Sequence, residues 1–190
     1  MHDKIDINNV LLAAVFSVLG IIVPMIFHVL GLGAVFLPMY LPLAMGAFFL
    51  TAGNAVLMGI FTPFVSALIT GMPPFYPPFA FLMMGQLGLF CVIISFMSHR
   101  LKTGVWPALL TAILADRLIL VGVYYIIIPY FGINFGLYTA YDLLKGLPGI
   151  ILMAVVVPPA VPGLKKIIQR QSLRLFEHGG THTHETRLDK

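Results

Sequence analysis

Long apolar runs alternate with short segments rich in glycine, proline or charge along most of the chain. A helix needs about 20 mostly apolar residues to cross the hydrocarbon core of a bilayer. Runs that approach this length predict six membrane-spanning helices, at residues 9–30, 36–51, 54–70, 79–98, 105–128 and 141–162. Several contain proline, which membrane helices tolerate when neighbouring groups satisfy the freed carbonyls. We therefore predict an all-α integral membrane protein, with a compact six-helix bundle in residues 1–168 and a polar cytoplasmic tail in residues 169–190.

The composition excludes a soluble domain. Hydrophobic residues make up 59% of the chain and charged residues 9%, with a mean hydropathy of +1.00. Soluble globular proteins carry roughly 25% charged residues, so this chain has too few to cover a surface that faces water. Cys91 is the single cysteine, which excludes an internal disulfide.

The positions of lysine and arginine predict the orientation in the membrane. Basic residues occur before the first run, between the fourth and fifth, and after the sixth: Lys4, Arg100, Lys102, Lys165, Lys166, Arg170 and Arg174. The opposite connections, 31–35, 71–78 and 130–140, contain neither lysine nor arginine. Basic residues concentrate in cytoplasmic loops, so both termini are expected in the cytoplasm. The first run exceeds the usual apolar length of a signal peptide, and we expect it to be retained.

Two neighbouring charges occupy the middle of the fifth predicted span. Asp116 and Arg117 lie about 16 Å from either end, at about 1.5 Å per residue. An ionisable side chain at this depth is costly, so each is a candidate for function or for buried pairing. Adjacent residues on a helix do not face each other, so at least one is expected to find a partner or a solvated cavity on another helix. A purely structural ion pair with a neighbouring helix stays open for both residues.

Other polar residues fall between the midplane and the outer surface, which predicts a pocket open to the outside: His28, Gln86, Asp142 and Lys145. Arg117 and Lys145 together would favour a carboxylate or phosphate group. Asp142 and Lys145 can instead pair locally, three residues apart. Aromatic residues around the pocket can stack on a flat organic ligand, although packing or an interfacial belt is the alternative for each. The substrate-binding residues that we predict are Phe36, Tyr40, Phe75, Tyr76, Gln86, Arg117, Tyr124 and Lys145.

The chain lacks the motifs of an energy source or a reaction. No GxxxxGK[ST], no HExxH and no Ser-His-Asp order with plausible depths occurs. We expect neither an enzyme nor a metal or cofactor bound by this chain, so uphill transport would need an ion gradient or a partner. Ala13 and Ser17 form a pair of small residues four positions apart, flanked by Gly20, which would let another helix approach closely. Internal packing of this face is the alternative.

Two short segments resemble those of a known transporter family. The first is FLPMYLP at 36–42, which leads to Pro63 and GMPP at 71–74; the second is GLPGIIL at 146–152, followed by Pro158. With the size, the six spans and both ends inside, residues 8–168 resemble the S component, the substrate-binding membrane subunit of energy-coupling-factor (ECF) vitamin transporters. The order and spacing of the segments carry this resemblance.

The resemblance implies high-affinity capture of a small water-soluble vitamin or related micronutrient at the cell membrane of a prokaryote. It implies partners as well: a transmembrane coupling (T) subunit and two ABC ATPases, which use the ATP. Small residues of the first helix contact the coupling subunit in that family, and Ala13 and Ser17 match this pattern, with serine in place of the commoner alanine. The alternative is a standalone ion-coupled carrier of a small organic solute, with Asp116 as the group that binds and releases the proton.

Overall fold

The computed structural model describes residues 7–31, 36–75, 79–123, 125 and 146–185, with side chains up to residue 167. Within these residues the chain is helical and has no strand. The helices are α1 (Ile7–Val29), α3 (Tyr40–Ala47), α4 (Ala52–Thr70), α5 (Phe79–His99), α6 (Val105–Gly122) and α9 (Leu147–Glu185). Five of these six are long and apolar enough to cross a membrane. The predicted all-helical class is confirmed, and the helices are compatible with a multi-pass membrane protein.

The second predicted span, 36–51, contains only a short helix. α3 has 8 residues, about 12 Å of helix, and is not among the five long helices. Leu37 has a φ of 47°, in the left-handed region, which interrupts any helix before α3. Pro38 removes a backbone N–H just upstream, whereas Pro42 lies in the first turn, where its missing N–H leaves no bond unmade.

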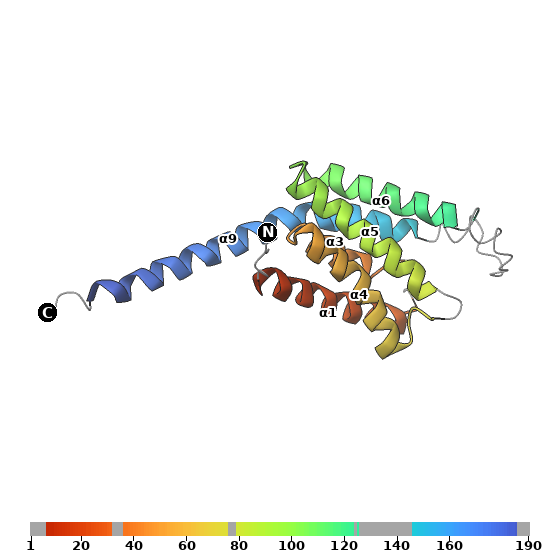
Figure 1. Ribbon diagram of the computed structural model, residues 1–190, viewed down its shortest axis with the longest axis horizontal. Coiled ribbons are helices and arrows are strands. Elements are labelled where there is room, and N and C mark those ends of the chain that lie inside the picture. Colours follow the sequence, from red (N-terminus) through yellow and green to blue (C-terminus); the bar gives the residue numbers. More distant parts are fainter. Residues whose placement is uncertain (1–6, 32–35, 76–78, 124, 126–145, 186–190) are drawn as a thin grey trace.

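The segment 36–50 nevertheless runs alongside α9. At one end, a Cβ on Gly149 would lie 2.6 Å from the carbonyl carbon of Phe36. At the other end, the Lys165 ammonium lies 6.0 Å from the centre of the Phe49 ring. Gly149 and Lys165 are separated by about 24 Å of helix. α3 itself contacts α1, α4, α5 and α9 and is largely buried, so it forms the middle of the core (Figure 1).

Glycines allow α4 and α5 to approach closely. A Cβ on Gly59 would lie 2.7 Å from the carbonyl carbon of Leu87, closer than real Cβ contacts allow. Gly88 meets the side chain of Ile60 in the same way, at 2.9 Å. Close backbone approach through small residues is typical of membrane helices. Gly53, also on α4, has no atom within 4 Å of its Cβ position and is therefore not part of this contact.

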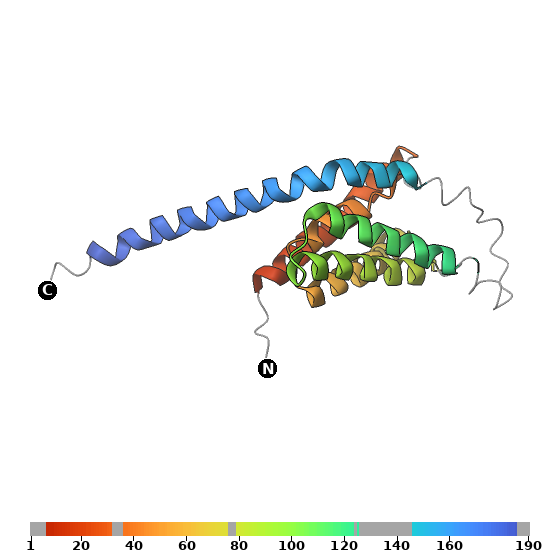
Figure 2. The same cartoon turned by 90° about the horizontal axis from the view of Figure 1, so that it is seen from above.

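α9 is much longer than the predicted span 141–162. It has 39 residues, about 58 Å of helix, whereas the hydrocarbon core is about 30 Å thick. It takes in most of the segment 169–190, which we predicted as a polar tail. The predicted span and the observed helix differ in length because a change from apolar to polar residues marks where a helix leaves the bilayer. Such a change does not by itself end the helix. Figures 1 and 2 show α9 extending well past the bundle.

One end of the bundle gathers the start of α1, the connection between α5 and α6, and the middle of α9 (Figure 1). The described basic residues of the loops and of α9 therefore lie towards the same end. Arg100 and Lys102 belong to the α5–α6 connection, and Lys165 and Lys166 belong to α9. The sequence pattern predicted this grouping.

Candidate functional site

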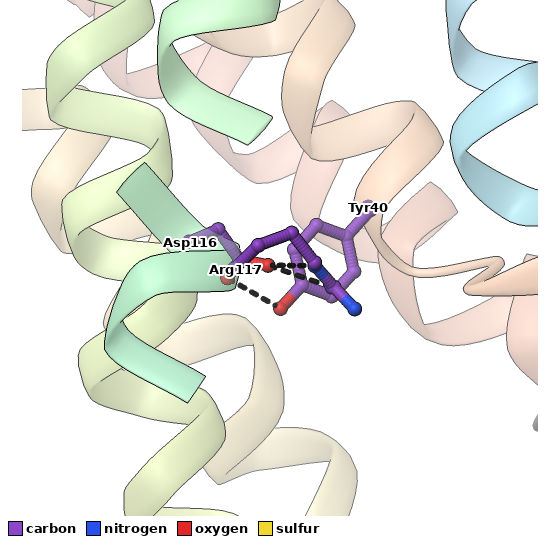
Figure 3. A network of polar contacts seen from close by, with 3 residues as sticks. All are labelled: Tyr40, Asp116 and Arg117. Atoms are coloured by element: carbon purple, nitrogen blue, oxygen red, sulfur yellow. Dashed lines mark hydrogen bonds and ion pairs between the residues drawn. The ribbon is translucent and has the colours of Figure 1, made fainter. Parts of the chain in front are cut away.

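Tyr40, Asp116 and Arg117 form a polar cluster inside the bundle (Figure 3). The Tyr40 hydroxyl donates to Asp116 Oδ1 at 3.0 Å. Arg117 donates from Nε at 3.1 Å and from Nη2 at 2.7 Å, both to Asp116 Oδ2. The Asp116 side chain is 2% exposed and the Arg117 side chain 20%. One buried carboxylate thus accepts three hydrogen bonds and links α6 to α3.

The inner face of α6 positions the carboxylate. Ala108, Leu109, Ala112 and Ile113 are buried on this helix and lead to Asp116 at helical spacing. Arg117 follows by one residue, so its Cα–Cβ bond points about 100° away around the helix. Our expectation that the two side chains do not face each other is wrong, because the long arginine side chain turns back to its neighbour. Our expectation of a partner on another helix is confirmed for Asp116, which is bonded to Tyr40.

α3 and α5 hold the tyrosine in place. The Tyr40 ring meets the Phe90 ring edge to face, with centroids 5.2 Å apart and planes at 72°. This is a favoured geometry for an aromatic pair. The sequence analysis did not select Phe90. Its spacing of four residues from Gln86 places both on one face of α5, and this was the signal available.

Gln86 lies one turn from Phe90 and is 4% exposed. No described residue is seen to hydrogen-bond with its amide. In the described part of the chain, every fully enclosed side-chain nitrogen or oxygen has a partner.

The remaining predicted aromatic residues fall into separate contacts. Phe36 packs against Phe27 of α1, with ring centroids 5.8 Å apart. Phe75, which is 38% exposed, lies between Phe64 and Phe81 at 6.3 and 5.9 Å. Of the predicted substrate-binding residues, the structure joins Tyr40 and Arg117 through Asp116. Three of the predicted substrate-binding residues lie outside the described part, together with Asp142: Tyr76, Tyr124 and Lys145.

The small residues of α1 face the interior. Gly20 is buried against side chains of Leu43 and Thr62. The hydroxyls of Ser17 and Thr62 lie 3.0 Å apart, and Ala13 packs at the edge of the core. The structure thus uses this face to bring α1 against α3 and α4, which is the internal packing that the sequence left open. Ala13 and Ser17 remain half-buried and keep an accessible part.

Neither a metal-binding group among the described residues nor a similar known protein adds information about the site. Among the described residues, no group of three or more His, Cys, Asp or Glu is placed to hold a metal ion. No family model and no curated protein matches the sequence, and no solved structure matches the fold. The resemblance to ECF S components therefore rests on the short segments in the sequence and stays a prediction.

Proposed function

We propose that this chain is the substrate-binding membrane subunit of an ECF-type importer and captures a small water-soluble vitamin or related micronutrient from outside. The polar cluster of Tyr40, Asp116 and Arg117, inside an otherwise apolar bundle, is the observation that carries the proposal. Intramembrane ionisable groups mark substrate pathways or structural pairs. Partial exposure of Arg117 favours the first, because a purely structural pair has no need of an accessible guanidinium.

The cluster has hydrogen-bonding capacity that the described residues do not use. Arg117 bonds Asp116 through Nε and Nη2, which leaves Nη1 as a donor. Gln86, on the adjacent helix α5, offers both a donor and an acceptor. Tyr40 and Phe90 supply aromatic surface beside them. Water exclusion by a bound ring or chain would strengthen the polar contacts.

The charge balance of the cluster bears on the ligand. Asp116 compensates Arg117, so the described part of the site is neutral overall. A neutral carbonyl or ring nitrogen can therefore bind Nη1 as well as a carboxylate can. A net preference for anions would depend on Lys145, which lies outside the described residues. The separate aromatic contacts of Phe36 and Phe75 are not needed for this core of the site.

The proposed topology has six crossings with both termini in the cytoplasm. Segment 36–50 would supply the second crossing, since it follows α9 from Gly149 to Lys165 and carries no charged residue. An even number of crossings between the start of α1 and the middle of α9 agrees with their position at one end of the bundle (Figure 1). The positive-inside rule then assigns that end to the cytoplasm of a prokaryotic cell.

A coupling subunit and two ABC ATPases would supply the energy for import. Docking through Ala13 and Ser17 would use only the part of each side chain that stays accessible, because both residues are half-buried and Ser17 is bonded to Thr62 of α4. The outward face of α1 is apolar and accessible. We propose that the coupling subunit meets both surfaces.

A binding experiment tests the proposal. The full chain would be purified in detergent, co-purifying small molecules identified by mass spectrometry, and a panel of vitamins titrated by calorimetry. We expect one compound to bind tightly, and Arg117→Ala to weaken its binding tenfold or more. Gln86→Leu, which leaves the ion pair intact, is expected to weaken binding without affecting the fold. Lys102→Ala, on the α5–α6 connection, is the control. If no vitamin binds the wild type, or if both site variants bind normally, the proposal is wrong.

The alternative of a proton-driven carrier makes a different prediction. Protonation of Asp116 would remove the negative charge that compensates Arg117 and leave the guanidinium unpaired, which disfavours this residue as a carrier of protons. Vesicles that contain this chain alone distinguish the two functions. Uptake that needs no ATPase and collapses with a protonophore would establish the carrier, whereas binding without uptake is expected of a substrate-binding subunit.

A further inference from the structure

Exposed cations gather at the end of the bundle where α5 ends, α6 begins and α9 passes. Arg100 and Lys102 lie in the α5–α6 connection, Lys165 and Lys166 lie on α9, and all four are exposed. Among the described side chains the single acid is Asp116, which is buried and paired with Arg117. The four cations therefore have no counter-ion within the part of the chain whose side chains are described.

Contacts through segment 36–50 bring the two groups of cations together. Lys165 of α9 lies 6.0 Å from the centre of the Phe49 ring. The backbone of the preceding residue, Phe48, is hydrogen-bonded to His99, the last residue of α5. The positive charge of Lys165 also interacts electrostatically with the His99 imidazole. Arg100 follows His99 directly. The end of α5 and the middle of α9 thus form one cationic surface.

Apolar side chains border the cations on the outside of the bundle. Leu101 lies between Arg100 and Lys102, and Phe96 is one turn earlier on α5; both are exposed. Trp106, the one tryptophan of the chain, is exposed in the first turn of α6. Tryptophan concentrates where the hydrocarbon meets the headgroups. These neighbours place the cations at headgroup level, beside a surface that faces acyl chains.

From this arrangement we infer that the basic end binds an anionic phospholipid. Its phosphate would lie between Arg100 and Lys165, and an acyl chain would follow Leu101 and Phe96. An amphiphile fits both halves of the surface, whereas a soluble acidic peptide would use the charges and leave the apolar side chains exposed. Each lysine or arginine near an anionic lipid surface strengthens binding about fivefold. This inference does not depend on the proposed transport function.

The test compares lipids that differ in headgroup charge. Native mass spectrometry of the detergent-solubilised full chain would measure the affinity for phosphatidylglycerol and for phosphatidylcholine. We expect preference for phosphatidylglycerol, and about a 25-fold loss of that affinity in Arg100→Gln/Lys165→Gln. Binding of phosphatidylcholine should not change. The control Arg100→Lys/Lys165→Arg keeps both charges and should keep the preference.

Three results would overturn the inference. They are equal binding of the two lipids by the wild type, undiminished phosphatidylglycerol binding in the glutamine variant, and displacement of the lipid by inorganic phosphate at similar affinity. The last would indicate a site for soluble phosphate. If Arg100→Gln/Lys165→Gln fails to fold, Lys102→Gln/Lys166→Gln removes the other two charges of the same surface. It is expected to show the same selective loss, and normal lipid binding in it would count against the site.

Discussion

Breaking the ion pair of α6 tests how the bundle tolerates charge. Arg117→Met removes the guanidinium and keeps an unbranched side chain. Asp116, 2% exposed, is then left with the Tyr40 hydroxyl as its one described donor. Removing one partner of a buried ion pair typically costs about 3–5 kcal/mol, since the remaining charge is uncompensated. We expect the free energy of unfolding of Arg117→Met to fall by about 3 kcal/mol or more.

Two further variants should cost less, for different reasons. Asp116→Asn leaves an unpaired guanidinium, but Arg117 is 20% exposed and can turn towards accessible space. Tyr40→Phe removes one hydrogen bond between helices, which in membrane proteins averages about 0.6 kcal/mol and reaches about 1.7 kcal/mol. The edge-to-face contact with Phe90 would remain. The expected order of destabilisation is therefore Arg117→Met, then Asp116→Asn, then Tyr40→Phe.

The double variant Asp116→Asn/Arg117→Met separates charge from packing. It removes both charges, so it should be more stable than Arg117→Met alone. Reversible unfolding in mixed micelles, followed by circular dichroism, measures all four variants against the wild type. Lowering the pH should also reduce the deficit of Arg117→Met, because protonation of Asp116 removes the unpaired charge. An Arg117→Met protein within about 1 kcal/mol of the wild type, or a double variant no more stable than Arg117→Met, would refute the reasoning.

Other contacts of the bundle give matched predictions. Gly59→Ala should destabilise the protein by about 2 kcal/mol in the same unfolding assay, because the new Cβ would meet the backbone of α5. Gly53→Ala should be neutral or slightly stabilising, because no atom lies within 4 Å of its Cβ position. Equal effects of the two variants would contradict the packing of α4 against α5. Ser95→Ala removes a 2.6 Å hydrogen bond to the carbonyl that ends segment 36–50 and should cost about 1–2 kcal/mol. Ser98→Ala, which bonds within its own helix, should cost less. Cys91 is fully buried, so maleimide should label it only on unfolding, detected as a mass increase; fast labelling of the folded protein would contradict its burial.

The sequence predicted the long helices well where helix-ending residues border the apolar run. α1, α4 and α5 begin and end within two residues of the predicted spans 9–30, 54–70 and 79–98. Glycine, proline or charge borders each of these runs. Segment 36–51 is equally apolar, but hydropathy carries no information about the left-handed backbone at Leu37, which limits the helix there.

For the candidate site, the sequence indicated which residues are costly to bury but not how they pair. Counting residues along the predicted span 105–128 put Asp116 and Arg117 near its middle, and in the structure the Asp116 carboxylate is buried on α6. The identity of the partner depends on how α3 packs against α6, and on the rotamer of a long side chain. Neither is encoded in spacing along one helix. Tyr40 was selected as an aromatic surface for a ligand, whereas its hydroxyl supports Asp116.

The adjacency of Asp116 and Arg117 has a consequence for assembly and for binding. The pair closes within α6, so this helix can enter the bilayer with its two charges already compensated, which reduces the cost of each. The spare acceptor capacity of Asp116 then attracts Tyr40, and this bond helps to hold α3, which is too short to span a membrane by itself. Among the described residues, Nη1 of Arg117 meanwhile has no partner. A ligand can therefore bind the guanidinium without breaking the contacts that hold the bundle together.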